Sequence, residues 1–249
     1  MRKIAVALSK GGVGKTTTVV NLAAGLARAG QRVLLVDMDT QGQLARALGV
    51  QAQAGVTDVA LGELSADQAV LNVRDGIWLL AGGRSLAGLK RVIARKDFGG
   101  EQTLTEALAP LEGQYDLVLV DTAPAWDTLT VNTIFYANQV LIPVSLEVLA
   151  LQGLIEFVRS LDSIQKYHPE LSLRYILPTF MDRRVRKSEE ILAQMIGYYN
   201  ELVCDPIRYN VRLSEAPGYG QTIFEYAPHS AGAEDYQRLT ERLVNDGRP

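Results

Sequence analysis

Short, unbroken apolar runs recur along the chain, and longer mixed stretches separate them. The runs are Ile4–Leu8, Val33–Val36, Leu117–Val120, Val140–Val144 and Tyr175–Leu177. Because polar residues do not alternate with the Val, Leu and Ile of these runs, they are typical of strands buried on both faces of a parallel sheet. Each spacer is long enough for a crossover helix. The pattern predicts an α/β fold with one doubly wound, mostly parallel sheet and helices on both faces.

Two stretches between the runs have helical patterns. Thr16–Ala29 predicts a helix that ends at Gly30. Ala87–Ala94 and Glu101–Leu108 predict a helical insertion that is broken at Gly99 and Gly100. Because no internal repeat, low-complexity segment or linker divides the chain, we expect one domain over residues 1–249, without an N-terminal helix-turn-helix extension.

Composition excludes several classes of protein. The chain has 249 residues, 47% of them apolar and 21% charged, so disorder is not its main state. A single cysteine, Cys204, and two histidines exclude a disulfide framework and a metal centre built from Cys or His. No run of 18 apolar residues occurs, and the chain enters a strand pattern at once, without a signal peptide. We therefore expect a cytoplasmic protein with no membrane partner.

A glycine-rich segment joins the first predicted strand to the first predicted helix. Residues 9–17 read Ser-Lys-Gly-Gly-Val-Gly-Lys-Thr-Thr. Glycines 11, 12 and 14 let backbone N–H groups turn inward at a helix N-terminus, where anions are favoured. Lys15 supplies a positive charge for the outer phosphates, and the hydroxyl of Thr16 can ligate Mg²⁺. This strand–loop–helix context predicts a phosphate-binding loop that can also hold Mg²⁺.

Carboxylates follow two of the predicted strands. Asp37 and Asp39 end the second apolar run, and Asp121 ends the third. Because the carboxyl ends of parallel strands face the ligand crevice, these side chains are expected beside the phosphate loop. One carboxylate can serve the magnesium shell while another orients the attacking water. A polar strand end with a capping aspartate is the alternative interpretation.

The charge distribution leaves two interpretations open. The net charge is −3, which argues against a nucleic-acid-binding protein as a whole, but residues 174–212 carry seven Lys and Arg against five Asp and Glu. The run Arg183-Arg184-Val185-Arg186-Lys187 is either a solvated helix start or a contact for DNA phosphates. Cations are unfavourable at a helix N-terminus, which favours the second use. Arg84 through Lys96 holds five further cations, which form either a solvated face or a partner surface.

Four segments resemble a known ATPase family. Lys10 through Thr17 resembles the deviant Walker A motif of the ParA/MinD family, to which Ser9 also points, since the general pattern has glycine there. Asp37 through Gln41 resembles its Asp-x-Asp-Pro-Gln switch, and Asp121 through Pro124 its Asp-x-x-Pro element. Asn210 through Pro217 resembles a run of the Soj-like branch. The departures are Thr40, Ala123, Arg208 and Tyr209, and the resemblance covers essentially the whole chain.

The resemblance implies an ATP sandwich homodimer and roles for particular residues. Lys10 would reach the ATP of the neighbouring subunit, Asp39 would position the hydrolytic water, and Asp37 would support the loop and the metal. The implied catalytic set is therefore Lys10, Lys15 and Asp39, and the implied metal set is Thr16, Asp37 and Asp121. The implied nucleotide-binding set is Lys10, Gly11, Gly12, Val13, Gly14, Lys15, Thr16 and Thr17, with Asn210 as an adenine partner.

The same resemblance implies nonspecific binding of double-stranded DNA. Residues matching Arg184 and Arg212 lie on the DNA-holding surface of the Soj-like branch, and we add Arg186 and Lys187 to the candidate DNA-binding set. A ParB-like protein would stimulate a slow ATPase. Because it would bind DNA, the protein would be nucleoid-associated in the cytoplasm. Hydrolysis would break the dimer and release the DNA, which would segregate DNA or another cargo.

Two alternatives use the same fold. A MinD-like positioning ATPase would need a basic membrane-targeting helix, and residues 239–249 are too acidic and too short for one. A metabolic enzyme, such as a biotin-precursor synthetase or a cobyrinate amidotransferase, would need a pocket for a small substrate. Its ATP hydrolysis would depend on that substrate and not on DNA.

Overall fold

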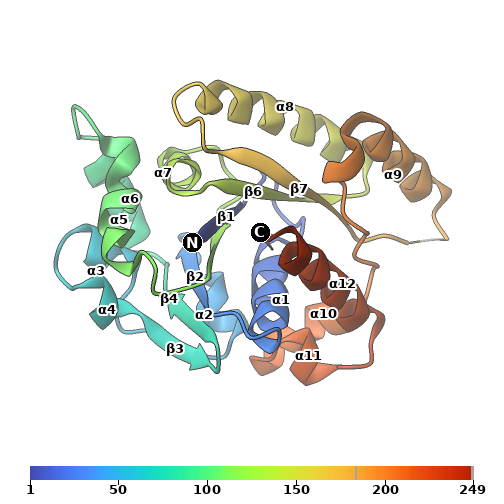
Figure 1. The fold of residues 1–249 in the computed structure, drawn as a ribbon, viewed down its shortest axis with the longest axis horizontal. Helices are drawn as coiled ribbons and strands as arrows, with labels where there is room; N and C mark the ends of the chain where they lie inside the picture. Colours follow the sequence, from blue (N-terminus) through green and yellow to red (C-terminus); the bar gives the residue numbers. More distant parts are fainter. Residues whose placement is uncertain (183, 248–249) are drawn as a thin grey trace.

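A seven-stranded sheet runs through the centre of the computed structural model, which describes residues 1–182 and 184–247 (Figure 1). The strands are β1 (Arg2–Val6), β2 (Val33–Met38), β3 (Leu71–Arg74), β4 (Ile77–Leu80), β5 (Leu117–Thr122), β6 (Gln139–Ser145) and β7 (Ser172–Thr179). Their order in the sheet is β3-β4-β2-β5-β1-β6-β7. Neighbouring strands pair in parallel, except that β3 and β4 are antiparallel. The predicted mostly parallel sheet is thus confirmed.

Helices cover both faces of this sheet (Figure 1). They are α1 (Lys15–Arg28), α2 (Gln43–Ala47), α3 (Val56–Ala60), α4 (Ala66–Ala69), α5 (Leu86–Ile93), α6 (Thr103–Leu108), α7 (Thr128–Tyr136), α8 (Val148–Gln165), α9 (Arg186–Tyr199), α10 (Val211–Glu215), α11 (Ile223–Tyr226) and α12 (Ala231–Asp246). Short 3₁₀ helices are η1 (Gly100–Gln102), η2 (Ala109–Leu111), η3 (Asn200–Leu202) and η4 (Ala216–Tyr219). On one face lie α1, α11 and α12, whereas α3 and α5 to α8 lie on the other.

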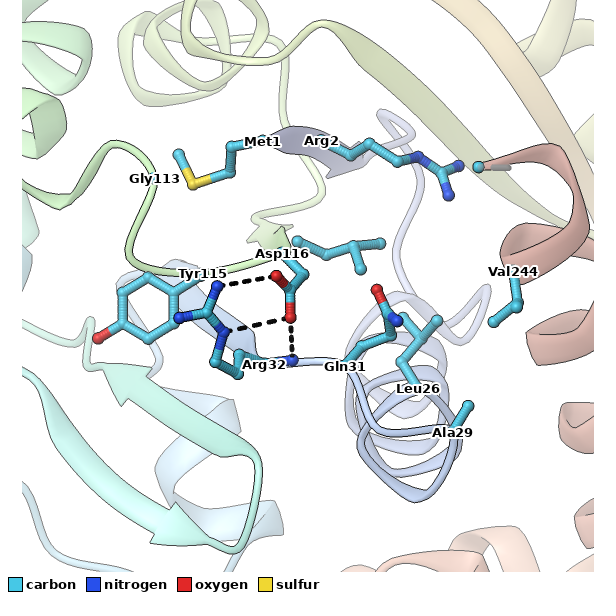
Figure 2. Close-up of a pocket in the computed structure, with 12 residues that line it drawn as sticks. Met1, Arg2, Leu26, Ala29, Gln31, Arg32, Gly113, Tyr115, Asp116 and Val244 are labelled. Carbon is cyan, nitrogen blue, oxygen red and sulfur yellow. Dashed lines mark hydrogen bonds and ion pairs between the residues drawn. The ribbon is translucent and has the colours of Figure 1, made fainter. Parts of the chain in front are cut away.

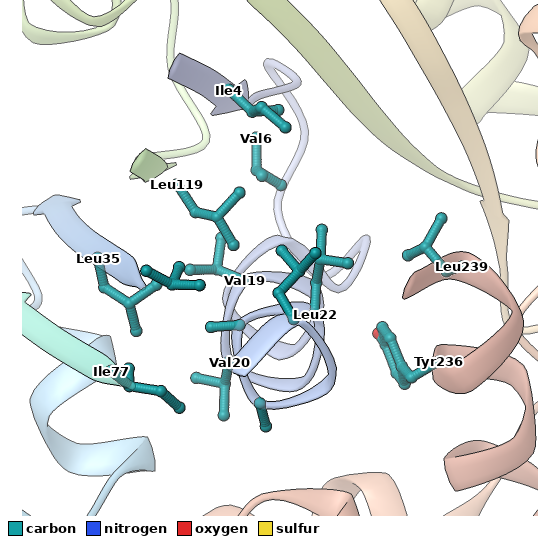
Figure 3. Packing of buried hydrophobic residues seen from close by; sticks show 14 of the residues in the cluster. Ile4, Val6, Val19, Val20, Leu22, Leu35, Ile77, Leu119, Tyr236 and Leu239 are labelled. Atoms are coloured by element: carbon teal, nitrogen blue, oxygen red, sulfur yellow. The ribbon is translucent and has the colours of Figure 1, made fainter. Parts of the chain in front are cut away.

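The central strands contribute side chains to the cores on both faces. On β1, Ile4 and Val6 pack with Leu22 of α1 and Tyr236 of α12 (Figure 3). Ala5 faces the opposite way and belongs to the core beneath α8. Because successive residues of a strand point to opposite faces, both sets must be apolar. This explains why the sequence shows unbroken apolar runs.

The five strands predicted from apolar runs are confirmed, with ends that differ by no more than three residues. The helical insertion is also confirmed as α5, η1 and α6, and Gly99 at the break has φ 71°. The sequence analysis did not predict β3 and β4. The edge strand β3 has no fully buried position and therefore no apolar run, whereas β4 is the apolar run Ile77-Trp78-Leu79-Leu80, a signal that the sequence does contain.

A glycine sets how closely α1 and α12 approach each other. A Cβ atom at Gly25 would overlap the hydroxyl oxygen of Thr240 and would lie 3.1 Å from the Thr240 Cβ. The Thr240 hydroxyl donates a hydrogen bond to the Tyr236 carbonyl inside α12, at 2.8 Å, and the residue is buried. The α1–α12 contact therefore depends on the missing side chain at Gly25.

We expect Gly25→Ala to destabilise the protein by about 1–3 kcal/mol, the usual cost of overpacking a core. The matched control is Gly88→Ala on α5, because a Cβ there meets nothing within 4 Å. Alanine is the better helix former by about 1 kcal/mol, so the control should be neutral or stabilising. Urea unfolding measures both changes. Equal stability of the two variants would contradict the close contact between α1 and α12.

Candidate functional site

Three strands end together beside the glycine-rich segment. In the register of the sheet, Asp121 of β5 pairs with Val6 of β1 on one side and with Asp37 of β2 on the other. The segment after β1 leads into α1 at this same edge. Asp37 and Asp121 are both fully buried, and Asp39 is nearly so. The expectation that these carboxylates gather beside the loop is confirmed.

The loop presents backbone N–H groups at the start of α1. Gly12 and Gly14 have φ values of 72° and 88°, a conformation that favours glycine. Gly14 is the N-cap of α1, and no side chain caps the first turn. N–H groups at a helix N-terminus attract anions. This geometry fits a phosphate group.

Lys15 is buried in the loop, with 7% of its surface exposed. Its Nζ donates hydrogen bonds to the carbonyl oxygens of Lys10, at 2.7 Å, and Leu8, at 3.1 Å. Burial lowers the pKa of Lys15, whereas the nearby charges of Asp121 and Asp39 act to raise it. A phosphate would give this buried ammonium group an anionic partner.

Asp121 carries a buried oxygen that no hydrogen bond satisfies. The Thr16 hydroxyl donates to Asp121 Oδ2 at 2.6 Å, whereas Oδ1 has no partner among the described residues. Burial raises the pKa of Asp121 to about 8, and the charge of Asp37 adds to this shift. An orphaned carboxylate oxygen beside a hydroxyl fits Mg²⁺, which keeps waters and takes few protein ligands. No cluster of three or more His, Cys, Asp or Glu forms a metal site in the part of the chain that is described.

Asp37 differs from Asp121 because both of its oxygens are used. Oδ1 accepts the backbone N–H of Asp39 at 2.9 Å, and Oδ2 accepts that of Leu44 at 3.1 Å. Burial raises the pKa of Asp37 to about 6, although these two hydrogen bonds oppose the shift. Asp37 therefore holds the turn after β2 and the start of α2. Of the two carboxylates predicted for the metal, Asp121 has the free oxygen.

Residues 37–42, which we call the switch segment, contact a glycine pair, Gly82 and Gly83. The Asp39 carboxylate accepts the Gln41 N–H at 2.9 Å, and the Asp39 carbonyl accepts the Gly83 N–H at 3.1 Å. A Cβ at Gly82 would overlap the Asp37 carbonyl oxygen. Gly82 and Gly83 therefore let another loop lie directly against the switch segment. Sequence reasoning missed this contact, since the pair lies about 40 residues away from Asp39.

Lys10 points toward an acidic residue of its own chain. Its Nζ lies 3.2 Å from Glu147 Oε2, just before α8, and the lysine side chain remains 30% exposed. Sequence reasoning did not single out Glu147. Nothing in the sequence near Lys10 indicates this partner, because the two residues are 137 positions apart.

A cavity of about 190 Å³ adjoins the phosphate loop, and Asn210, the predicted adenine partner, is among the residues that line it. Gly14, Thr17, Phe180, Tyr209 and Tyr236 also line it. The Asn210 Oδ1 accepts the Arg212 N–H at 2.9 Å and so caps α10. Phe180 was missed, although it directly follows β7, and the rule that carboxyl ends of parallel strands face the ligand could have found it.

Each candidate DNA-binding cation is exposed and already paired with a carboxylate. The pairs are Arg184 with Asp182 at 2.7 Å, Arg186 with Glu190 at 3.3 Å, Lys187 with Glu190 at 3.4 Å, and Arg212 with Glu215 at 2.8 Å. Arg183 lies outside the described residues. Glu190 offsets positive charge at the start of α9. The helix dipole therefore no longer favours a DNA contact over a solvated helix start for this basic run.

Another cavity, of about 670 Å³, lies at the opposite edge of the sheet, where β1 and β5 begin. Figure 2 shows the Arg32 guanidinium directed at the Asp116 carboxylate within it, at 2.9 Å. None of the residues predicted for the functional site lines this cavity. Although this cavity is larger than the one beside the phosphate loop, we do not assign the nucleotide to it.

Within the described ranges, no helix has the length and apolar character that a membrane span requires.

Comparisons with known proteins agree with the geometry of the loop. The family model described as an AAA domain matches residues 1–173. The chromosome-partitioning ATPase Soj of Thermus thermophilus is 42% identical over 246 residues, which are 98% of this chain and 96% of that protein. The chain belongs to the ParA/Soj-type family of partition ATPases. The chromosome partitioning protein ParA of Myxococcus xanthus is 36% identical to this ParA/Soj-type chain, over 100% of the chain and 89% of that relative.

A solved structure extends the likeness beyond partition proteins. Cobyrinic acid a,c-diamide synthase from Mycobacterium smegmatis, with bound ADP and magnesium, superposes with a TM-score of 0.85 and is 33% identical. The match covers 100% of this ParA/Soj-type chain and 97% of that one. The fold class is thereby confirmed, and the fold alone does not distinguish partition from metabolism.

We expect the ParA/Soj-type chain, without nucleotide and metal, to lose stability as pH rises from about 4 to about 8. The pKa of Asp121 is raised from 3.8 to about 8, so in this window the folded state binds a proton that the unfolded state has lost. Asp121→Asn cannot ionise, and its stability relative to the parent should therefore increase toward pH 8.

Thermal unfolding in a chelator, across this pH range, measures the difference. Asp205→Asn is the control, because it removes an exposed carboxylate. If Asp121→Asn followed the pH dependence of the parent, the buried carboxylate would not be protonated as described.

Proposed function

We propose that residues 1–249 form one ATPase domain that binds ATP with Mg²⁺ as a homodimer and partitions DNA. The observation that carries this proposal is the Asp121 oxygen that has no hydrogen-bond partner. It lies beside Thr16, and the loop that precedes Thr16 holds the buried Lys15. A buried carboxylate and a buried ammonium group at one helix N-terminus are costly without a ligand that bears both anionic and metal character. Magnesium-bound ATP has both.

Different residues would bind the phosphates, the metal ion and the base of the nucleotide. N–H groups from Gly11 to Thr17 would surround the phosphates, and Lys15, which is buried in the loop, would bind the outer ones. Thr16 and Asp121 would hold Mg²⁺, the latter through water, and the metal would neutralise charge between the phosphates. The cavity beside Asn210 would take the base, since it opens next to Gly14 and Thr17.

Hydrolysis would depend on Asp39 and Lys10. Asp39 is 9% exposed, and its carboxylate is fixed by the Gln41 N–H, so it is held in place to orient an attacking water. Lys10 would leave Glu147 and neutralise the phosphates of the neighbouring subunit. Because ATP binds best to the closed pair, it would shift the balance from monomer to dimer.

The exposed cations provide the contact with DNA. Arg184, Arg186, Lys187 and Arg212 would exchange their own carboxylates for backbone phosphates, which carry no base sequence. Dimerisation doubles the number of such cations, so binding would follow the nucleotide. A ParB-like partner would stimulate the slow hydrolysis and thereby release the DNA. The protein would act in the cytoplasm, associated with the nucleoid.

A metabolic synthetase is the second candidate, and two observations favour it. The cobyrinic acid a,c-diamide synthase is 33% identical. In addition, a cavity of about 540 Å³ lies beside the switch segment, lined by Gly42, Arg46, Gly83 and Arg84 among others. Such a volume suits a small substrate. What stimulates ATP hydrolysis separates the candidates, since a synthetase responds to its substrate and a partition ATPase to DNA.

Asp39→Ala should trap an ATP-bound dimer that keeps DNA. A side chain that assists proton transfer contributes about 10²–10⁴-fold to a rate, so without the Asp39 carboxylate at the attacking water hydrolysis should fall at least about 100-fold. Sedimentation and light scattering with ATP, ADP or neither, each with and without nonspecific DNA, measure the outcome. Asp97→Ala, an exposed control, should behave like the parent. A monomer in the presence of ATP would count against the dimer.

Arg212→Glu should lose DNA and still dimerise with ATP. If half of the eight cations in a dimer engage a phosphate, Arg212 of each subunit among them, the parent should show a slope of log K against log salt of about −3.6, and losing the two Arg212 contacts should flatten it by about 1.8. Gel shifts over a salt series measure the slope. Arg91→Glu on α5 is the control, and it also tests the alternative basic surface. An unaltered gel shift for Arg212→Glu would remove this residue from the DNA site.

A further inference from the structure

Arg74, at the end of β3, joins three segments through its guanidinium group. Nη2 donates to the Gly220 carbonyl at 2.6 Å, Nη1 to the Leu48 carbonyl at 3.3 Å, and Nε to Glu225 Oε1 at 2.8 Å. The side chain is 21% exposed. A guanidinium group has a rigid planar set of donors, so it fixes the relative position of the groups it binds.

The segments that Arg74 joins belong to two functional parts of the chain. Leu48 ends α2, and α2 begins directly after the switch segment, with Gly42 as its N-cap. Gly220 ends η4, which directly follows α10, the helix of Arg212. Arg74 therefore lies between the element that would sense the nucleotide and the element that would contact DNA.

A contact between two glycines brings these elements together beside Arg74. A Cβ at Gly49 would lie 3.0 Å from the Gly220 Cα, and a Cβ at Gly220 would lie 2.6 Å from the Gly49 Cα. Both residues have positive φ, 68° and 64°. Backbone meets backbone here, so no flexible side chain absorbs a movement of α2.

A short polar path leads from Arg74 to Arg212. Glu225, which accepts from Arg74, also accepts the Thr222 N–H at 2.7 Å and so fixes the start of α11. At the end of α11, the Tyr226 hydroxyl donates to Glu215 Oε2 at 3.0 Å, and Arg212 donates to the same oxygen at 2.8 Å. A displacement of α11 therefore changes the surroundings of Arg212.

We propose that Arg74 is a positioning residue that couples the switch segment to the surface around Arg212. The proposal rests on the proposed function, in which Asp39 of the switch segment acts on bound ATP and Arg212 contacts DNA, and it adds that ATP binding moves the switch segment. A shift of α2 on nucleotide binding is passed to η4 and α11 through the Arg74 hydrogen bonds and the Gly49–Gly220 contact. The coupling is reciprocal, so DNA also strengthens the binding of ATP.

The two carbonyl contacts carry the coupling more than the ion pair does. A partly exposed ion pair such as Arg74–Glu225 contributes little by itself. The Leu48 and Gly220 carbonyls, in contrast, lie on the two elements that must move together. Lysine keeps the charge but lacks the planar fork that spans both carbonyls. Arg74→Lys should therefore resemble Arg74→Gln and not the parent.

The test compares both variants with Arg32→Gln, which removes the solvent-exposed Arg32–Asp116 pair beside the starts of β2 and β5 (Figure 2). Calorimetry with a nonhydrolysable ATP analogue and light scattering measure nucleotide binding and dimerisation. Gel shifts measure the DNA affinity of the analogue-bound dimer. Hydrogen exchange of residues 211–226, with and without the analogue, reports the coupling without DNA.

In both Arg74 variants we expect ATP affinity and dimerisation close to those of the parent, and DNA affinity about fivefold lower or more, the lower range of allosteric coupling. The nucleotide-dependent change in exchange at 211–226 should disappear, whereas Arg32→Gln should keep it. If both Arg74 variants kept that change and the DNA affinity of the parent, the coupling role would be overturned while the partition function stood. If the parent itself bound no DNA with ATP, the proposed function would fail, and exchange would still decide whether Arg74 links the two elements.

Discussion

The burial of two facing carboxylates is the constraint on which the rest of this structure depends. Asp37 and Asp121 stand opposite each other on β2 and β5, and neither reaches solvent. Burying a carboxylate is costly unless N–H or O–H groups donate to it. Donors from the turn after β2 satisfy both oxygens of Asp37, whereas Thr16 of α1 donates only to Oδ2 of Asp121. The same hydrogen bonds fix the turn after β2 and the start of α1. These are the two segments that would contact a bound nucleotide.

Much of this arrangement could be predicted because its signals are local. Strands buried on both faces appear as apolar runs, and a loop of glycines between such a run and a helix has few other uses. Asp37, Asp39 and Asp121 each follow a run, so the parallel sheet brings them to one edge. The dimer, the DNA surface and the adenine contact stay predictions, since they concern molecules beyond this one chain.

The remaining features depend on pairs of residues that are distant in the sequence. Glu147 meets Lys10 because β6 lies beside β1, and Gly83 meets Asp39 because β4 lies beside β2. The edge strand β3, which carries Arg74, has too few buried positions to show a pattern. The carboxylates beside the basic run were visible in the sequence, but their pairing in space was not. Such contacts depend on the order of the strands in the sheet, which the hydrophobic periodicity of the sequence does not specify.

The contact between Gly49 and Gly220 has a consequence for how the sequence can vary. Each backbone occupies the space that a methyl group on the other residue would need. Neither position can therefore accept a side chain first and wait for the other to adapt, because the obstacle is main chain on both sides. A side chain at either glycine would therefore have to displace both turns, so the two positions are constrained together and not one by one.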